Sequence, residues 1–359
     1  MRLGIIGLPN SGKTTIYNAL TGGELLTSAA TTGQFEINSA TIRVPDLRID
    51  HLSAIYQPRK TTYTHITYVD IAGLEEGIGA GALAGQFRNE LAQVDGFLHV
   101  LRGFDDERVP HPYGAVDPAR DLATIDGEFL LMDLLSVGAR QERIENERRV
   151  KGKRADPSLT DELLLFEKLK AHLEDEQPLR SLRLSRAEDK RIRGFGFLTR
   201  KSVLVVINSG DGADDSTHLL DPPYPKAASV SIQGALEAEI AQLDAADAAL
   251  FMEEYGIVEL SRSRMIRLSY DLLGIRSFFT AGQDEVRAWS FPDGATAPQA
   301  AGVIHSDLQR GFIRAEVFPY ADLAELGSEF AIKSAGKQRL EGKDYRVLDG
   351  DILNIRHNS

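Results

Sequence analysis

A phosphate-binding loop is predicted at residues 7–14, where Gly-Leu-Pro-Asn-Ser-Gly-Lys-Thr fits the pattern G-x-x-x-x-G-K-[ST]. Gly7 and Gly12 allow the backbone to curl so that successive N–H groups point at phosphate oxygens. We expect the Lys13 ammonium group to contact the β- and γ-phosphates of a nucleoside triphosphate and the Thr14 hydroxyl to bind Mg²⁺. The nucleotide contacts predicted here are Asn10, Ser11, Gly12, Lys13, Thr14 and Thr15.

A second motif, Asp-Ile-Ala-Gly at residues 70–73, follows a segment that reads as a strand. In phosphate-loop NTPases this aspartate meets the Mg²⁺ shell and the glycine N–H senses the γ-phosphate, so we assign these roles to Asp70 and Gly73. Leu74 stands where switch GTPases commonly have a glutamine that orients the attacking water. Because leucine forms no side-chain hydrogen bond, we expect slow turnover, on the order of 10⁻⁴ to 10⁻² s⁻¹.

His111 is the candidate for a polar group that replaces the missing glutamine. It lies in a loop between two prolines, and an imidazole can act as a polar group near neutral pH. From the residues alone, the alternative is an ordinary loop histidine.

The base of the nucleotide is expected to meet residues 208–211, Asn-Ser-Gly-Asp, which follow an apolar strand. GTPases place N-K-x-D there, and its aspartate accepts two hydrogen bonds from guanine. Asn208 and Asp211 match this pattern, but Ser209 replaces the lysine that packs on the base. The choice between adenine and guanine therefore stays open on these residues.

The surrounding elements predict an α/β fold. Strands are expected at 40–44, 64–70, 96–102, 202–208 and 228–232, with helices at 14–20, 48–56 and 87–94. Alternation of strand and helix is typical of a parallel sheet. Two long helical patterns separated by Gly152 and Asp-Pro at 156–157 predict an antiparallel hairpin within about 126–196.

The tip of this hairpin is basic. It contains Arg148, Arg149, Lys151, Lys153 and Arg154 without an intervening acid. A solvated tip and a contact with ribosomal RNA are both compatible with that run.

Bulk composition limits the function classes. The chain has 359 residues, a formal charge of −12 and no cysteine, which excludes disulfides, a thiolate nucleophile and Cys-ligated zinc. The negative charge argues against a globally basic nucleic-acid binder. No apolar run approaches the length of a membrane span and no signal peptide is predicted, so we expect a cytoplasmic protein without membrane contact.

These motifs together resemble the Obg-like ATPase family (YchF type). The resemblance extends over nearly the whole chain and is most specific near its end. The matching runs include 4–10, 68–74, 279–282, 285–289, 294–305, 311–315 and 341–345.

The resemblance implies a Ras-like phosphate-loop NTPase domain at 1–277, with the coiled-coil hairpin inserted at about 126–196, and a β-grasp (TGS) domain at 278–359. It matches Leu74, because family members have a hydrophobic residue after the same turn. His111 corresponds to a loop histidine implicated in hydrolysis. The base-contacting motif of the family is N-x-x-E, so Asn208 and Ser209 correspond to its first two residues and Asp211 replaces its glutamate.

The second Mg²⁺ ligand of the family is a switch-I threonine, whose position aligns best with Gln34. Thr32 lies nearby and is the candidate for this role, beside Thr14 and Asp70.

The leading hypothesis is a monomeric, Mg²⁺-dependent NTPase that hydrolyses ATP to ADP and phosphate as a slow switch on ribosomes. Two alternatives are a GTP-preferring member of the Obg group and an RNA-binding protein that nucleotide regulates. A metabolic phosphotransferase is a third, but residues 74–85 contain no arginine or lysine for a lid.

Overall fold

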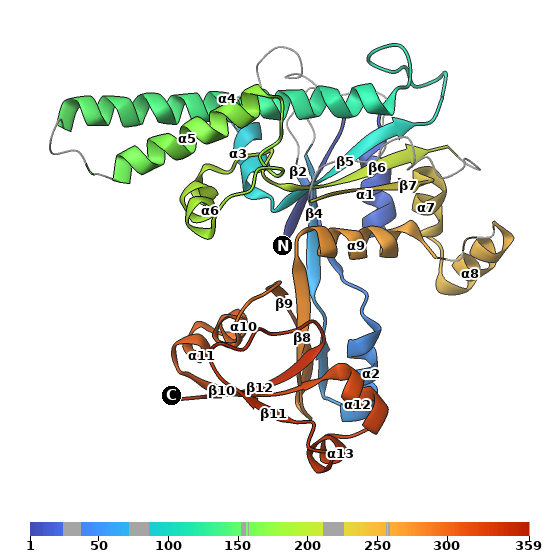
Figure 1. Ribbon diagram of the computed structural model, residues 1–359. Helices are drawn as coiled ribbons and strands as arrows, with labels where there is room; N and C mark the ends of the chain where they lie inside the picture. Colours follow the sequence, from blue (N-terminus) through green and yellow to red (C-terminus); the bar gives the residue numbers. More distant parts are fainter. Residues whose placement is uncertain are drawn as a thin grey trace. The chain divides into compact units, whose positions relative to one another are not determined.

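The structure, a computed structural model, describes residues 1–23, 37–71, 86–151, 156, 158–210, 226–255, 257 and 259–358. Its elements are labelled in Figure 1. The chain forms two units, and each is described by itself. Unit 1 comprises Met1–Thr41 and Thr67–Met265, and unit 2 comprises Ile42–Ile66 and Ile266–Ser359.

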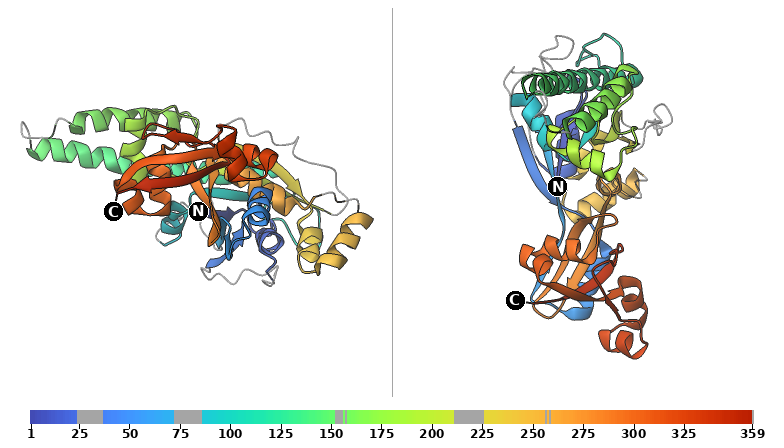
Figure 2. Two further views of the ribbon diagram at one scale, coloured as in Figure 1. Left: turned by 90° about the horizontal axis from the view of Figure 1, so that it is seen from below. Right: turned by 60° about the vertical axis from the view of Figure 1, so that its left-hand side comes forward.

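Unit 1 is built on a six-stranded sheet with the order β2-β4-β1-β5-β6-β7 (Figures 1 and 2). The five strands from β4 to β7 pair in parallel. Nearly every residue of β5 and β6 is buried, as expected for parallel strands covered on both faces. The strands are β1 (Arg2–Ile6), β2 (Ile37–Arg43), β4 (His65–Ile71), β5 (Gly96–Gly103), β6 (Ser202–Ser209) and β7 (Ala227–Ile232).

Helices cover this sheet. On one face, Leu91 of α3 and Phe129 of α4 pack in a core cluster with Phe97 and Val205 of the strands. No described helix is long and apolar enough to cross a membrane. The helices that begin in unit 1 are α1 (Lys13–Thr21), α3 (Gln86–Gln93), α4 (Pro118–Lys151), α5 (Ser158–Glu174), α6 (Arg186–Ile192), the 3₁₀ helix η3 (Arg193–Phe195), α7 (Gly234–Ile240), α8 (Ala245–Glu254) and α9 (Ser261–Leu272).

Helices α4 and α5 form the predicted hairpin, and both figures show them side by side. Arg140 donates two hydrogen bonds of 2.8 Å to the Glu162 carboxylate, which ties α4 to α5. Helix α4 begins at Pro118, before the predicted start of the insertion at about 126. Proline favours the first position of a helix, so residues 118–125, predicted to belong to the nucleotide domain, form the first turns of α4.

Unit 2 contains a mixed six-stranded sheet with the order β11-β10-β12-β8-β9-β3. The hairpin β8–β9, the following helix α10 and the parallel pairing of β12 with β8 give the predicted β-grasp arrangement. The strands are β3 (Lys60–Thr62), β8 (Ile275–Ala281), β9 (Glu285–Pro292), β10 (Phe312–Pro319), β11 (Arg339–Glu341) and β12 (Asp351–His357). The helices are α2 (Leu47–Tyr56), α10 (Ala297–Ile304), α11 (Ser306–Arg310), α12 (Tyr320–Leu326) and α13 (Glu329–Ser334).

The predicted boundary between residues 277 and 278 stays a prediction, and the two compact units divide the chain differently. Residues 42–66 belong with the C-terminal sheet, since β3 pairs in parallel with β9, and Ile49 of α2 is buried in a cluster with Phe279. Residues 266–277 also belong to unit 2. A helix between two strands reads the same whichever sheet it covers, so the sequence pattern places α2 in the nucleotide domain.

Candidate nucleotide-binding site

The predicted phosphate loop joins β1 to α1. Gly12 has φ +90°, and a Cβ atom there would lie 2.1 Å from Nδ2 of Asn208, so both the backbone conformation and the space require glycine. Gly12 is also the N-cap of α1 and offers no side-chain cap. The first N–H groups of α1 therefore have no capping side chain and face the loop side, where a phosphate is a suitable acceptor.

Lys13 lies in the loop as predicted. Its buried ammonium group donates to the carbonyl oxygens of Gly7, at 3.1 Å, and Leu8, at 2.9 Å. The Ser11 hydroxyl oxygen is buried and has no hydrogen-bond partner among the described residues. The loop thus presents a positive charge and a polar donor to an anionic ligand.

Asn208 connects the base motif to the phosphate loop. Its Nδ2 donates to the carbonyl oxygen of Ser11 at 3.1 Å, and its Oδ1 accepts from the N–H of Gly234 at 3.2 Å. Both contacts are buried, and they join the end of β6 to the loop before α1 and to the start of α7. The first part of the predicted base motif and the phosphate loop therefore lie together.

Ser209 follows at the end of β6. Its hydroxyl group shares a 2.8 Å hydrogen bond with the hydroxyl group of Ser231 on the neighbouring strand β7. The side chain is 4% exposed. The hydroxyl group of Ser209 is therefore engaged within the sheet, and its predicted contact with a base stays a prediction.

Asp70 is buried near the end of β4, and in the sheet it is the register partner of Ile5 on β1. Burial, and then the negative charge of Asp70, raise the pKa of Tyr17 on α1. The Asp70 charge is therefore near α1, whose second residue is Thr14. Carboxylate and hydroxyl oxygens are hard donors of the kind that Mg²⁺ prefers beside phosphates, so the two residues fit such an ion.

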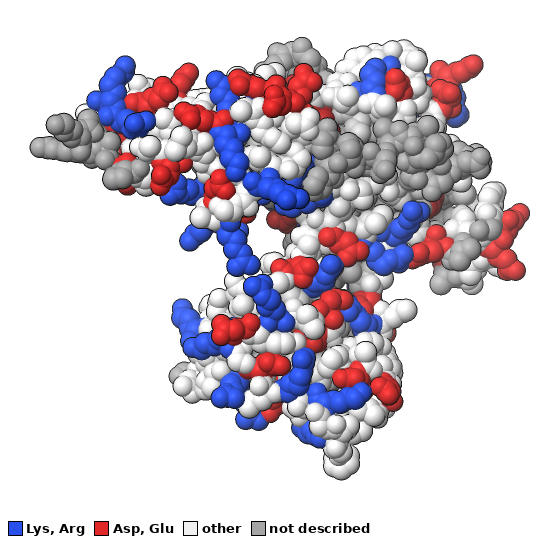
Figure 3. Space-filling view, viewed as in Figure 1, with Lys and Arg blue, Asp and Glu red and all other residues white. Residues whose placement is uncertain are grey.

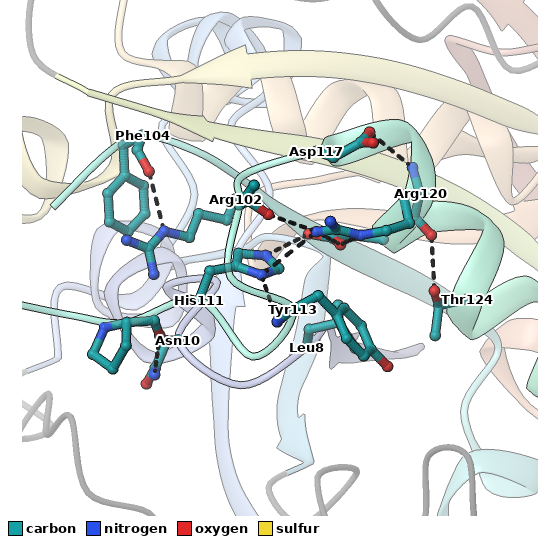
Figure 4. A network of polar contacts seen from close by, with 12 residues as sticks. Leu8, Asn10, Arg102, Phe104, His111, Tyr113, Asp117, Arg120 and Thr124 are labelled. Atoms are coloured by element: carbon teal, nitrogen blue, oxygen red, sulfur yellow. Dashed lines mark hydrogen bonds and ion pairs between the residues drawn. The ribbon is translucent and has the colours of Figure 1, made fainter. Parts of the chain in front are cut away.

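His111 is buried in the loop between β5 and α4 (Figure 4). Its Nε2 lies 2.8 Å from Oδ2 of Asp121, and its Nδ1 accepts from the N–H of Tyr113 at 3.1 Å. Because Nδ1 accepts, Nε2 must be the protonated nitrogen that donates to Asp121. The phosphate loop contacts the same segment, since Nδ2 of Asn10 donates to the carbonyl oxygen of Pro110 at 3.0 Å.

A second histidine, His99 on β5, is the register partner of Ile6, the last residue of β1 before the phosphate loop. Burial, followed by the charges of Arg180 and Lys13, lowers the pKa of His99 to about 3. His99 is therefore uncharged at neutral pH and is a buried part of the sheet core.

Three predicted residues lie outside the described residues: Thr32, Gly73 and Asp211. Leu74 does as well. The predicted roles of Thr32 in metal binding, of Gly73 in γ-phosphate sensing and of Asp211 in base recognition remain predictions, as does the slow turnover expected from Leu74.

The sequence reasoning missed two partners of the site. Gly234 supplies a backbone N–H to Asn208, and any residue except proline has that donor, so no residue type marked it. Asp121 contacts His111 from the first turn of α4. The only sequence signal for Asp121 was that it is an acidic residue in the first turn after Pro118. Acidic residues are common in the first turn of helices, so this signal did not indicate a contact with His111.

Comparison with known proteins identifies the family. Residues 2–134 match the family model described as 50S ribosome-binding GTPase, and residues 275–358 match the YchF GTPase C-terminal model, described as a protein of unknown function. The chain is 38% identical to "Ribosome-binding ATPase YchF" of Bacillus subtilis, with 99% of this chain and 98% of that protein covered. "Obg-like ATPase 1" of Oryza sativa is 37% identical, with 100% and 92% covered.

A solved structure of a YchF protein also matches this chain. The Schizosaccharomyces pombe YchF GTPase superposes with a TM-score of 0.83 at 30% identity, with 99% of this chain and 97% of that chain covered. The similarity thus includes both units and the hairpin, as the resemblance in the sequence predicted. With relatives above 30% identity along almost its full length, the chain belongs to the YchF family of Obg-like ATPases.

Proposed function

We propose that this protein hydrolyses a nucleoside triphosphate, with ATP as the first choice and GTP as the alternative. The observation that supports this most directly is the side chain of Asn208, which joins the base motif to the phosphate loop. One bound molecule that has both a base and phosphates would contact both segments. The relatives named as ATPases add support for ATP.

The proposed roles follow from the chemistry of each group. The Lys13 ammonium and the first N–H groups of α1 stabilise negative charge on the transferring phosphoryl group. Thr14, Asp70 and Thr32 are the residues proposed to hold Mg²⁺, which in such sites neutralises charge on phosphate oxygens. The N–H of Gly73 reports on the γ-phosphate, and His111 is the polar group that positions the attacking water.

A hydrolysis assay with a charge-removing variant tests this proposal. Lys13→Met is expected to lower kcat/KM for ATP by about 100-fold or more, because one charge in a phosphate site contributes several kcal/mol. Lys190→Met on α6 is the matched control, since this exposed lysine lies outside the loop. Equal hydrolysis by Lys13→Met and the parent protein would contradict the proposal.

The choice of base needs its own measurement. Competition of ATP against GTP is proposed with the parent protein, Asp211→Glu and Asp211→Ala. Tighter ATP binding in Asp211→Glu and tighter GTP binding in the parent would identify Asp211 as a guanine reader. Equal relative affinities in all three proteins would show that Asp211 does not select the base.

The ribosome is the proposed partner, and the support for it is that several relatives are named ribosome-binding ATPases. Action on ribosomes implies a cytoplasmic protein, and we propose that it acts as a monomer. The basic hairpin tip is the proposed contact, with Arg148, Arg149, Lys151, Lys153 and Arg154. Arg148 and Arg149 are exposed near the end of α4, whereas Lys153 and Arg154 lie outside the described residues. Figure 3 shows Lys and Arg side chains close to the outer end of the hairpin, with acidic side chains further along it.

A further inference from the structure

His111 has no ring nitrogen available for water in this structure. Its Nε2 donates to Oδ2 of Asp121 and its Nδ1 accepts from the N–H of Tyr113. The side chains of His111 and Asp121 are 3% and 2% exposed, so the hydrogen bond between them is shielded from solvent. A histidine arranged in this way can neither orient nor deprotonate a water molecule.

Arg120 supports the carboxylate that holds the histidine. It donates to Oδ1 of Asp121 through Nε, at 3.1 Å, and through a terminal nitrogen, at 2.8 Å. The same guanidinium group donates to the carbonyl oxygen of Ala115 at 2.7 Å and lies 3.5 Å from Nδ1 of His111 (Figure 4). Asp121 is thus fixed between a cation and the imidazole, and a charge-assisted hydrogen bond is stronger than a neutral one.

The loop is also tied to the phosphate loop. Pro110, directly before His111, accepts a hydrogen bond from the side chain of Asn10 at 3.0 Å. The backbone of His111 is therefore one residue away from a group that contacts the phosphate loop. A change in the phosphate loop could therefore be transmitted to His111 through this contact.

We propose that Asp121 is a positioning residue that holds His111 in a position in which it does not support hydrolysis. We call the hydrogen bond between His111 and Asp121 the latch, and Arg120 strengthens it. This inference rests on the proposed role of His111 in hydrolysis. In a catalytic carboxylate–histidine pair, one ring nitrogen binds the acid and the other faces the reactant. Here the second nitrogen faces a backbone N–H and a guanidinium group, so the geometry indicates a latch.

The latch makes the hydrolytic rate depend on the fraction of molecules in which His111 is released. When the released form is rare, any change that weakens the latch raises kcat in proportion to that fraction. Asp121→Ala is expected to raise kcat for ATP by about tenfold, as loss of a charge-assisted hydrogen bond shifts such an equilibrium. Asp121→Asn, whose amide oxygen can still accept from Nε2, is expected to raise kcat by a smaller factor, about threefold.

The matched control is Asp106→Ala. Asp106 is a carboxylate of the same loop that pairs with an arginine, Arg108, but it makes no contact with His111 among the described residues. The kcat of Asp106→Ala is expected to equal that of the parent protein. The double variant His111→Ala/Asp121→Ala is expected to hydrolyse no faster than His111→Ala, because the latch acts only through the imidazole.

A rise in kcat is the readout that a merely structural role of Asp121 would not produce, and ring-nitrogen NMR tests the hydrogen bond itself. The parent protein is expected to show His111 as the Nε2–H tautomer, and Asp121→Asn is expected to show weaker protection of that proton. If Asp121→Ala does not fold, Asp121→Asn provides both the kinetic and the NMR comparison.

The outcomes separate the two proposals. Hydrolysis that His111→Ala leaves intact would refute the role of His111 and, with it, the latch. Hydrolysis that His111→Ala abolishes, but that Asp121→Ala and Asp121→Asn leave unchanged or lower, would refute the latch alone.

Discussion

The side-chain amide of Asn208 donates a buried 3.1 Å hydrogen bond to the carbonyl oxygen of Ser11. This bond joins residues that are 197 positions apart in the chain. The other end of the amide accepts from the N–H of Gly234 at 3.2 Å. One side chain therefore fixes the phosphate loop, the end of β6 and the start of α7 against one another, before any base contact is considered.

Replacement of Asn208 by alanine is expected to destabilise unit 1 and weaken nucleotide binding. Both partners would be left buried without a hydrogen bond, and each such group costs about 1–3 kcal/mol. We expect the free energy of unfolding to fall by about 2–4 kcal/mol and nucleotide affinity to fall about tenfold or more. Chemical denaturation and calorimetric titration measure the two effects.

The control for this variant is Asn354→Ala. Asn354 is exposed and makes a hydrogen bond to Glu316, so its loss is expected to cost less than about 0.5 kcal/mol. Equal stability of the two variants would show that the Asn208 bridge does not hold the site together.

Gly12 gives a second prediction, because a methyl group has no room there. The added Cβ would lie 2.1 Å from Nδ2 of Asn208, at a backbone φ of +90°. Gly114 has a similar φ of +81°, but a Cβ there would meet nothing within 4 Å. Gly114→Ala therefore measures the backbone strain alone, about 1 kcal/mol, whereas Gly12→Ala adds the collision.

We expect Gly12→Ala to destabilise unit 1 by at least about 2 kcal/mol more than Gly114→Ala, in the range of overpacked sites. Thermal and denaturant unfolding of the two variants provide the comparison. If both variants were destabilised equally, the close approach of Gly12 to Asn208 would not contribute to the loss of stability.

The sequence predicts that the phosphate loop and the base motif belong to one site, and the hydrogen bond from Asn208 to Ser11 brings the first residue of the base motif to that loop. Residues 7–14 follow β1 and Asn208 lies near the end of β6, and the carboxyl ends of strands in a parallel sheet meet at one edge. Residue type and strand order were therefore sufficient to bring them together.

Long-range pairing was not predictable in the same way. Nothing local in Lys60–Thr62 shows that this strand pairs with β9, more than two hundred positions away, so the sequence pattern groups residues 42–66 with the nucleotide domain and not with unit 2. The contact of His111 with Asp121 also depends on where α4 begins, and the helical pattern predicted an insertion at about 126–196 without the first turns from Pro118.

The hairpin provides a prediction about the proposed ribosome contact. Arg148 and Arg149 are both exposed near the end of α4. Replacing both with glutamine removes two positive charges. The salt slope, which is the steepness with which the logarithm of the binding constant falls with the logarithm of the salt concentration, decreases by about 0.7–0.9 for each phosphate that is no longer neutralised. We therefore expect weaker ribosome binding with a slope that is smaller by about 1–2.

Arg186→Gln/Arg193→Gln is the matched control, since it removes two exposed arginines from α6 and η3. Sedimentation with ribosomes at several salt concentrations measures both proteins. The proposed contact would be wrong if the α4 variant and the control had the same affinity and slope.

Asp133 on α4 leads to a prediction about pH. Its buried carboxylate accepts hydrogen bonds from the N–H groups of Leu198, at 3.0 Å, and Thr199, at 2.8 Å, and from the Thr199 hydroxyl at 2.6 Å. Burial raises the pKa of Asp133 to about 6, although these hydrogen bonds and the charge of Arg88 act in the opposite direction. The folded protein thus binds the Asp133 proton more tightly than the unfolded chain does.

The sign of the effect follows from this difference. Between the unfolded pKa of 3.8 and the folded pKa of about 6, the folded state holds more protons, so this residue's contribution to stability falls as pH rises. The slope approaches about 1 kcal/mol per pH unit within that window and vanishes above it. Asp133→Asn cannot titrate, so the stability difference between parent and variant is expected to grow as pH falls from 7 to about 4.

Denaturant unfolding at several pH values measures this difference directly. At pH 8, Asp133→Asn is still expected to cost about 1–3 kcal/mol, because the new amide NH₂ would face an N–H or hydroxyl donor of Leu198 or Thr199. Asp126→Asn, on the same helix, is the comparison, since its carboxylate pairs with Arg180 and makes none of these backbone contacts. A parent–variant difference that is constant from pH 4 to pH 8 would mean that the pKa of Asp133 is the same in the folded and unfolded states, so that its three hydrogen bonds offset its burial.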